Sequence, residues 1–424
     1  MPPFPEPIHA MIVLGTRPEA IKLAPVARAM AEDPRFEPVV VSTGQHREML
    51  EQMLHLLEVK ITTDLAVMRE RQDLAGLTGR LVDGLGRTIS EARPDLVVVQ
   101  GDTTTAMCGA LAASYQKVPV AHVEAGLRTG DLGNPFPEEI NRQLIGRISR
   151  WHFAPTERSA GHLRHEGVPD ERIEVTGNTV IDNLFWMLAR GQGVPAFRTG
   201  GTDPGDDPRT PEGRAGRSSL RSGGTDPGDD PRTPEGRAGR SSLRSGRPSR
   251  ILVTLHRRES QGEEMTAMAR SLRRLADRGD CELLLPLHKS PAVRESLLPI
   301  LDGHSRVTIV EPLGYADFAA TLAECDLVLT DSGGVQEEAP SLGKPVLVLR
   351  ATTERPEAVE AGAAKLIGTD AAVLYDEATR LLDDHDLYAG MANVVNPFGD
   401  GRAAERIIAS LTRDHGALPA GVLN

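Results

Sequence analysis

The stretch that decides the fold is Met11-Ile12-Val13-Leu14-Gly15-Thr16-Arg17-Pro18-Glu19-Ala20-Ile21-Lys22, in which four apolar residues lead into a glycine and then into a helical pattern. Apolar residues recur at helical spacing from Pro18 to Ala31, and Pro18 is suited to a first helical position. The stretch therefore predicts a buried strand, a short turn and a helix. That order is the repeating unit of α/β proteins with parallel sheets.

The same unit recurs along the chain. Apolar runs at 38–41, 95–99 and 118–123 alternate with helical patterns, the last of them at about 137–149, and the pattern restarts with runs at 251–255, 283–285, 307–310, 327–330 and 346–349. Continuous apolar strands separated by helices indicate parallel sheets covered on both faces. A chain of 424 residues has room for two or three domains. We predict two Rossmann-like, doubly wound α/β domains at residues 8–185 and 250–395, the first joined by a C-terminal helix at about 398–415.

A low-complexity insert at 198–249 separates the two halves. Gly201 to Gly223 is repeated residue for residue as Gly224 to Gly246. Each copy is rich in Gly, Pro, Arg and acids and has one large apolar residue, too little apolar surface to offset the entropy of ordering. We therefore expect a disordered, dispensable connector.

Composition excludes several classes of protein. The chain has 48 Lys and Arg against 60 Asp and Glu, a net charge of −12, which argues against a nucleic-acid or anionic-membrane partner. The three cysteines, Cys108, Cys281 and Cys325, are widely spaced and match no metal-ligand pattern. No apolar stretch is long enough for a membrane span, and the first residues lack the basic start and apolar core of a signal peptide. We expect a soluble cytoplasmic protein without a metal.

Two strand-to-helix turns carry the features of an anion site. In the first half, Gly15 ends a strand, and Arg17 and Lys22 follow at the start of the helix, where the N-terminus favours a negative charge. An ordinary βα loop with solvated charges is the alternative. The turn lacks the three-glycine dinucleotide fingerprint, so a nicotinamide cofactor is not supported.

The second such turn follows the predicted strand at 327–330. Ser332, Gly333 and Gly334 precede a helical pattern and can present several N–H groups to a diphosphate. Glu338, placed on the first helical turn, could accept hydrogen bonds from ribose hydroxyls, or it could simply complement the helix dipole.

Several carboxylates also follow predicted strands. Asp102 and Glu124 each end a strand, Glu138 opens the next helix, and Arg142 lies one turn later. Any one of these acids could be a cap or half of an ion pair, but several at one edge of a parallel sheet can raise a pKa and supply a general base. His256 ends the first strand of the second half beside two arginines, which fits an anion-binding edge or a structural histidine.

These motifs together resemble the non-hydrolysing UDP-N-acetylglucosamine 2-epimerases. The resemblance covers about residues 10 to 410 without the repeats, and the motifs that carry it are GTRPEAIK at 15–22, GDTTT at 101–105, HVEAGLRTG at 122–130, PEEINR at 137–142, HRRE at 256–259, DSGGVQEE at 331–338, TTERPE at 352–357 and NPFGDG at 396–401.

The resemblance implies a fold, an activity and a set of site residues. The fold is glycosyltransferase-B-like, with a cleft between two Rossmann-like domains, usually in a homodimer. The activity is the interconversion of UDP-N-acetylglucosamine and UDP-N-acetylmannosamine without metal or other cofactor, which supplies N-acetylmannosamine for cell-surface polysaccharide. By motif position, the catalytic residues are Asp102, Glu124, Glu138 and His256, and the substrate-binding residues are Arg17, Lys22, Arg142, Ser332, Gly333, Gly334, Glu338 and Arg355.

Many bacterial relatives also bind a second UDP-N-acetylglucosamine as an activator. The matching positions are Gln45, His46, Arg71, Arg257 and His288. Glu48 stands where relatives with this site often have Gln, and Ser290 stands where Asn often precedes proline. Two other functions stay open at this point: a hydrolysing epimerase that releases N-acetylmannosamine and UDP, and a non-catalytic regulator that binds a nucleotide sugar.

Overall fold

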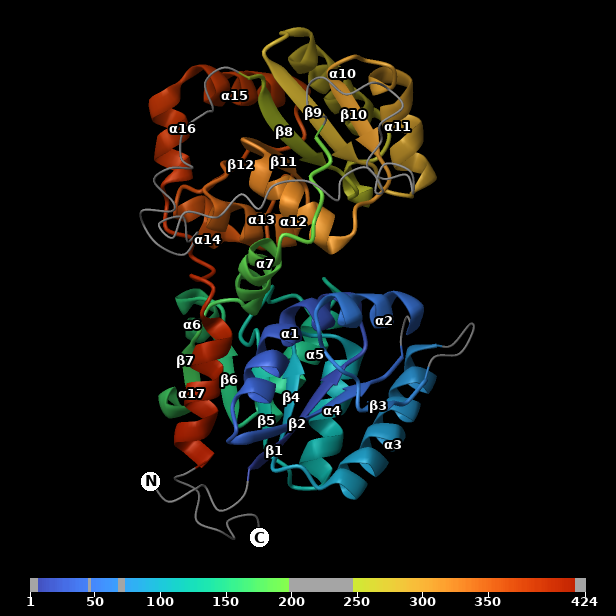
Figure 1. The fold of residues 1–424 in the computed structure, drawn as a ribbon, viewed down its shortest axis with the longest axis vertical. Helices are drawn as coiled ribbons and strands as arrows, with labels where there is room; N and C mark the ends of the chain where they lie inside the picture. Colours follow the sequence, from blue (N-terminus) through green and yellow to red (C-terminus); the bar gives the residue numbers. More distant parts are fainter. Residues whose placement is uncertain (1–6, 45–46, 68–72, 198–246, 416–424) are drawn as a thin grey trace, which may run out of the picture. The chain divides into compact units, whose positions relative to one another are not determined.

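The computed structural model describes residues 7–44, 47–67, 73–197 and 247–415 (Figure 1). The chain forms two compact units, the first made of Met1–Trp186 and Pro397–Asn424 and the second of Met187–Asn396. Each unit contains one parallel sheet with helices packed on it, so the predicted pair of doubly wound α/β domains is confirmed. The repeats at 201–246 lie outside the described residues, and their predicted disorder stays a prediction.

The first unit is built on a seven-stranded parallel sheet. Its strand order is β3-β2-β1-β4-β5-β6-β7, so the chain winds to one side from β1 and then to the other from β4. The strands are β1 (Ile8–Leu14), β2 (Phe36–Ser42), β3 (Thr63–Asp64), β4 (Leu96–Gln100), β5 (Val120–Val123), β6 (Trp151–Ala154) and β7 (Ile173–Val175).

The helices of the first unit pack on its sheet and on one another. Helix α1 contacts α2 and α17, while α4 contacts both α3 and α5. Leucines of α3 and alanines of α4 pack on the valines of β1 and β4 to form the core on that face. The helices are α1 (Arg17–Glu32), α2 (Arg47–Leu56), α3 (Leu74–Ala92), α4 (Thr104–Tyr115), α5 (Glu138–Ile148), α6 (Glu157–His165) and α17 (Ala403–His415), with a 3-10 turn η1 (Asp170–Arg172). Helix α7 (Thr179–Arg190) begins in this unit and ends in the second.

The second unit repeats this plan with six parallel strands. Their order is β10-β9-β8-β11-β12-β13, and the winding reverses between β8 and β11. The strands are β8 (Ser249–Thr254), β9 (Cys281–Pro286), β10 (Val307–Val310), β11 (Leu327–Thr330), β12 (Val346–Val348) and β13 (Ala364–Leu366).

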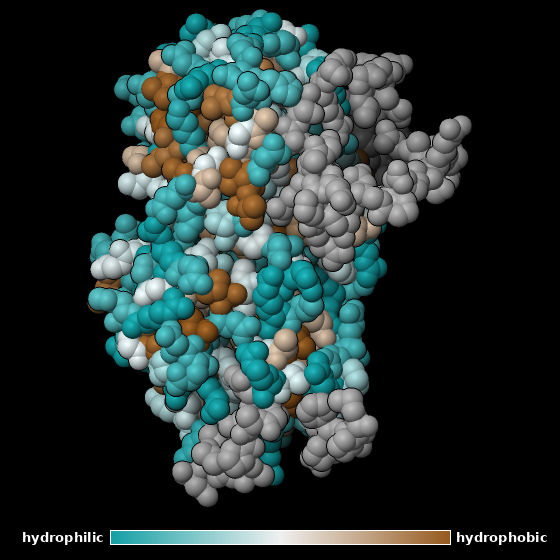
Figure 2. Space-filling model, turned by 90° about the vertical axis from the view of Figure 1, so that its left-hand side faces the viewer, coloured by the Kyte–Doolittle hydropathy of each residue, from teal (hydrophilic) through white to brown (hydrophobic). Residues whose placement is uncertain are grey.

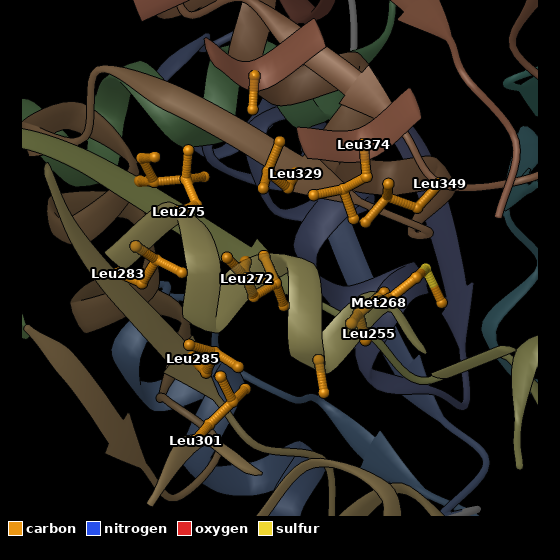
Figure 3. Packing of buried hydrophobic residues seen from close by; sticks show 14 of the residues in the cluster. Leu255, Met268, Leu272, Leu275, Leu283, Leu285, Leu301, Leu329, Leu349 and Leu374 are labelled. Atoms are coloured by element: carbon orange, nitrogen blue, oxygen red, sulfur yellow. The ribbon is translucent and has the colours of Figure 1, made fainter. Parts of the chain in front are cut away.

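Aliphatic side chains form the core of the second unit (Figure 3). Met268, Leu272 and Leu275 of α10 pack against Leu283 of β9 and Leu329 of β11. The helices of this unit are α10 (Glu263–Asp277), α11 (Pro291–Leu301), α12 (Tyr315–Glu324), α13 (Gly333–Glu338), α14 (Pro356–Glu360), α15 (Ala371–Asp383) and α16 (His385–Ala392), with 3-10 turns η2 (Arg258–Ser260) and η3 (Ala339–Leu342).

The sequence prediction missed four strands: β3, β6, β7 and β13. They are only two to four residues long, and β6 contains His152 while β13 contains Lys365, so they lack a continuous apolar run. The expected position of Pro18 was also wrong by one residue. Thr16 caps α1 and Arg17 is its first residue, so Pro18 is the second.

No helix in the described parts of the chain is long and apolar enough to cross a membrane. On the face shown in Figure 2, hydrophobic residues lie in separate patches within a mainly hydrophilic described surface.

One close contact fixes the loop that follows β5. Gly126 has a φ of +88°, and a Cβ atom placed there would lie 2.2 Å from the carbonyl oxygen of Ser159 in α6. The Gly126 carbonyl in turn lies 2.9 Å from Nδ1 of His162. Glycine is therefore required for both its conformation and its lack of a side chain.

We predict that Gly126→Ala destabilises the first unit far more than Gly167→Ala. Gly167 has a similar φ of +83°, but a Cβ there would meet nothing within 4 Å. The control should lose about 1–2 kcal/mol from the left-handed backbone alone, and Gly126→Ala roughly 1–3 kcal/mol more from the clash. Urea unfolding of both variants measures the difference, and equal losses would show that α6 moves away at no cost.

Candidate active site

The turn between β1 and α1 is held by a capping box. The Thr16 hydroxyl accepts from the Glu19 backbone N–H, and the Glu19 carboxylate accepts from the N–H groups of Gly15 and Thr16 at 3.0 and 2.7 Å. A Cβ on Gly15 would lie 2.3 Å from Oγ1 of Thr43, so this glycine is needed for packing inside the unit. The Arg17 side chain is exposed.

Glu19 is the site residue that sequence reasoning missed at this turn. Its side chain is completely buried, and its second oxygen accepts from the hydroxyl of Thr103, 2.5 Å away, which is the N-cap of α4 in the loop after β4. Burial raises the pKa of Glu19, while the hydrogen bonds from Thr103, Thr16 and the backbone oppose that rise. Glu19 thus joins the loops after β1 and β4. The Thr-x-x-Glu spacing of Thr16 and Glu19 is a capping-box signal that could have revealed it.

Glu124 follows β5 and has a backbone φ of +62°, a conformation that non-glycine residues rarely adopt. Its carboxylate is buried and pairs with Lys22 of α1 through Oε1. The side-chain amides of Gln100 and Asn178 also donate to it, one to each oxygen. Lys22 and Glu124, which the sequence prediction selected separately, therefore lie together, and two amides that it did not select complete the arrangement.

Asp102 follows β4 and forms an ion pair with the buried Arg142 of α5. The amide of Asn141 donates to the Asp102 carbonyl at 2.9 Å, so the first turn of α5 is attached to the end of β4. Burial raises the pKa of Asp102; Arg142 and Lys22 oppose this, whereas Glu124 adds to it. A half-buried carboxylate with a raised pKa beside a second carboxylate fits a general base.

The two acids that open α5 have different environments. Glu139 is fully buried, lies 3.3 Å from Arg142 and accepts from Gln143 and from the backbone of Thr129. Burial alone would raise the pKa of Glu139, but these donors and Arg142 together lower it. Glu138 is half-buried, and within the described residues its carboxylate makes no hydrogen bond or ion pair. Glu139 thus fixes the loop, while Glu138 can contact a ligand.

The second unit has its own polar group at the ends of β8 and β11. His256 Nδ1 lies 2.7 Å from the fully buried carboxylate of Asp331, which also accepts the backbone N–H groups of His256 and Arg257. Burial would raise the pKa of Asp331, but its bonds with His256 and the backbone lower it below the usual range. Asp331 therefore orients His256. The sequence prediction did not select it, although its place directly after an apolar strand was a usable signal.

The start of α13 differs in part from the prediction. Ser332 is the N-cap, and Gly333 and Gly334 form the first turn, as expected. Glu338, however, is the last of the six residues of α13 and not part of its first turn, because the helix begins directly at Gly333. Arg355 forms a hydrogen bond with Glu337, the residue before Glu338. The suggestion that Glu338 complements the helix dipole from the first turn was therefore wrong, because this buried residue lies at the other end of the helix.

Two of the five predicted activator positions lie beside His256. The His288 ring lies 5.9 Å from the His256 ring, and Arg257 Nε donates to the Asp331 carbonyl. Gln45, His46 and Arg71 lie outside the described residues. The activator site stays a prediction.

Buried histidines support the edge that carries Glu124. His122 of β5 lies 2.7 Å from the Gly101 carbonyl through Nε2, and its register neighbour His152 of β6 lies 3.1 Å from the Ser149 carbonyl. Burial lowers the pKa of His122 to about 3 and that of His152 to about 4. Both rings are therefore neutral in the folded protein near pH 7, and both can donate from Nε2.

The polar residues thus collect after β1, β4 and β5 in one unit and after β8 and β11 in the other. A family model described as UDP-N-acetylglucosamine 2-epimerase matches residues 28–198 and 235–412. The UDP-N-acetylglucosamine 2-epimerase of Escherichia coli K12 is 44% identical over 405 residues, which cover 95% of this chain and 98% of that protein. The chain belongs to the UDP-N-acetylglucosamine 2-epimerase family.

Solved structures of this epimerase family agree with that assignment. The crystal structure of the Neisseria meningitidis UDP-GlcNAc 2-epimerase bound to UDP-GlcNAc has a TM-score of 0.77 and 39% identity, and covers 96% of this chain and 100% of that chain. The Methanocaldococcus jannaschii enzyme in complex with UDP-GlcNAc and UDP has a TM-score of 0.70 and 31% identity, with 96% and 100% covered. Within the described residues, no cluster of His, Cys, Asp and Glu is arranged to hold a metal ion.

We predict that the first unit loses stability in mild acid because of His122 and His152. Their folded pKa values lie below the ordinary 6.5, so the unfolded chain binds protons first. The two histidines therefore cost no free energy of unfolding above pH 6.5. Between pH 6.5 and about pH 4, each lowers the free energy of unfolding by about 1.4 kcal/mol per pH unit.

His152→Gln keeps a neutral donor and should make this pH dependence shallower. Urea unfolding between about pH 7 and 5 tests the prediction. His165→Gln replaces an exposed histidine of α6 and is the control. An unchanged slope in His152→Gln would contradict the assignment.

Proposed function

We propose that this protein interconverts UDP-N-acetylglucosamine and UDP-N-acetylmannosamine by inverting C2 of the sugar. The observation that carries the proposal is the group of Asp102, Glu124 and Glu138 at one edge of the first sheet, with Lys22 and Arg142 paired to two of them. Membership of the epimerase family supports the same reaction. A protein that only bound the nucleotide sugar would not need three carboxylates at that edge.

The chemistry explains why carboxylates are needed. The C2–H bond of a pyranose has no adjacent carbonyl, so direct removal of the proton is very unfavourable. When the C1–O bond to UDP breaks first, UDP leaves with the bonding electron pair and the positive charge at C1 acidifies C2–H. A carboxylate then takes the proton, and a C1=C2 double bond forms. Protonation of C2 on the opposite face and return of UDP to C1 complete the inversion.

The family resemblance supports a role for residues of each unit in this mechanism. Asp102, Glu124 and Glu138 are the acid and base groups, and Lys22 and Arg142 orient two of them through ion pairs. Arg17, Arg355, the Ser332 hydroxyl and the N–H groups of Gly333 and Gly334 bind the diphosphate. The Ser332 N–H is not among these groups, because it donates to the Thr330 hydroxyl. Glu338 accepts from the ribose. His256, oriented by Asp331, stabilises the leaving UDP. Electrostatic groups of this kind are often worth roughly 10²–10³ in rate.

The decisive experiment is proton NMR of the protein with UDP-N-acetylglucosamine in D₂O. We expect the epimer to carry deuterium at C2, because a carboxylate exchanges its proton with solvent. Glu124→Gln and Asp102→Asn should each reduce kcat by roughly 100-fold or more. Glu157→Gln removes an exposed carboxylate of α6 and should leave the rate unchanged.

The two alternative functions give different results in the same NMR experiment. A hydrolysing epimerase would release N-acetylmannosamine together with UDP, and a regulator would exchange no proton. Epimer that keeps its C2 proton, with no glycal released, would exclude the elimination mechanism.

The family resemblance also supports a homodimer and a cytoplasmic location. We predict that sedimentation equilibrium gives twice the mass of one chain at micromolar concentration. A single-chain mass there would exclude a stable dimer.

A further inference from the structure

Two buried amides hold the carboxylate of Glu124 from different elements. Gln100, the last residue of β4, donates from Nε2 to Oε2, and Asn178, which precedes α7, donates from Nδ2 to Oε1 at 3.0 Å. The side chains are nearly inaccessible, with 3% and 2% of Gln100 and Asn178 exposed. Each carboxylate oxygen therefore has one neutral donor in a fixed position, in addition to the Lys22 ion pair.

Asn178 is itself fixed by the C-terminal segment of the chain. Its backbone N–H donates to the Phe398 carbonyl at 2.7 Å, and its Oδ1 accepts from the Val180 N–H at 3.1 Å. The neighbouring Gly177 and Gly399 lie so close that a Cβ on either would be 3.1 Å from the Cα of the other. Phe398 lies just after Pro397, where the chain returns to the first unit. The returning segment therefore determines where the Asn178 amide is held.

We propose that Asn178 and Gln100 are positioning residues for Glu124, and that Asn178 links this carboxylate to the returning C-terminal segment. The proposal rests on the proposed function, in which Glu124 exchanges a proton with C2. A glutamate side chain has three rotatable bonds, and proton transfer requires a donor–acceptor distance near that of a hydrogen bond. Without the two amides, the carboxylate would lose a fixed donor on each oxygen and could rotate more freely.

The kind of donor matters as well as its position. An amide N–H orients a carboxylate through its direction and adds no charge, whereas a second lysine or arginine would hold the carboxylate more tightly and weaken it as a base. Because the two amides contact Glu124 and not the groups proposed to bind the diphosphate, their loss should reduce kcat and leave KM nearly unchanged.

The test compares Gln100→Met and Asn178→Ser with a variant of a buried asparagine on α7. Gln100→Met keeps the length of the side chain without its donor, and Asn178→Ser keeps an oxygen that can accept from the Val180 N–H. We expect kcat to fall by roughly 10-fold to 100-fold in each variant, as for a lost hydrogen bond to a charged group, with KM within a factor of about 3.

The control is Asn183→Ser on α7. Asn183 is buried and accepts from Arg28, away from Glu124, so its kcat should equal that of the wild type. In the double variant Gln100→Met/Asn178→Ser, the loss should be smaller than the product of the two single losses, because both amides act on one carboxylate.

Three results would overturn the proposal. Variants that retain wild-type kcat would show that the two amides are not needed to position Glu124. A loss of kcat that only follows the loss of folded protein, measured by urea unfolding, would show a purely structural role. A wild-type protein that does not epimerise would overturn the proposed function and this inference together, whereas an active wild type with unaffected variants overturns only the inference.

Discussion

The reversal of strand order at the middle of each sheet is the constraint on which the rest of the structure depends. From β1 and β4 in one unit, and from β8 and β11 in the other, the chain winds in opposite directions. The loops that leave these neighbouring strands must therefore diverge to opposite faces, which leaves room for a ligand at the carboxyl ends. Gly15, Asp102, His256 and Asp331 all follow these four strands.

The acids near the strand ends of the two sheets fall into two groups with different tasks. Glu19, Glu139 and Asp331 are fully buried, and each accepts backbone N–H groups from a loop next to the site. A buried carboxylate is costly unless donors surround it, so these acids are stable only with their loops in place. Asp102 and Glu138 are half-buried and retain access to a ligand. The first group shapes the loops, whereas Asp102, Glu138 and the 8% exposed Glu124 are the proposed acid and base groups.

The sequence predicted the parts of the fold that have continuous apolar strands, and it predicted site residues where a motif follows such a strand. It did not reveal β6 and β7, because a strand as short as Trp151–Ala154 with a histidine in it has no distinctive period. Asn178 was missed for the same reason, since it follows β7. The predicted position of Glu338 was wrong because the start of α13 was placed too late. Two successive glycines are not typical of a helix, although α13 already begins at Gly333.

Contacts between residues far apart in the sequence could not be predicted from local patterns. The link between Asp102 and Arg142 joins residues 40 positions apart, and that between Lys22 and Glu124 joins residues 102 apart. Such pairs depend on strand order, which decides that β5 lies beside β4 and β4 beside β1. Once that order is known, the polar residues at the ends of these strands must meet, since parallel strands end at the same edge. Topology, more than any single motif, therefore turns separate strand-end residues into one site.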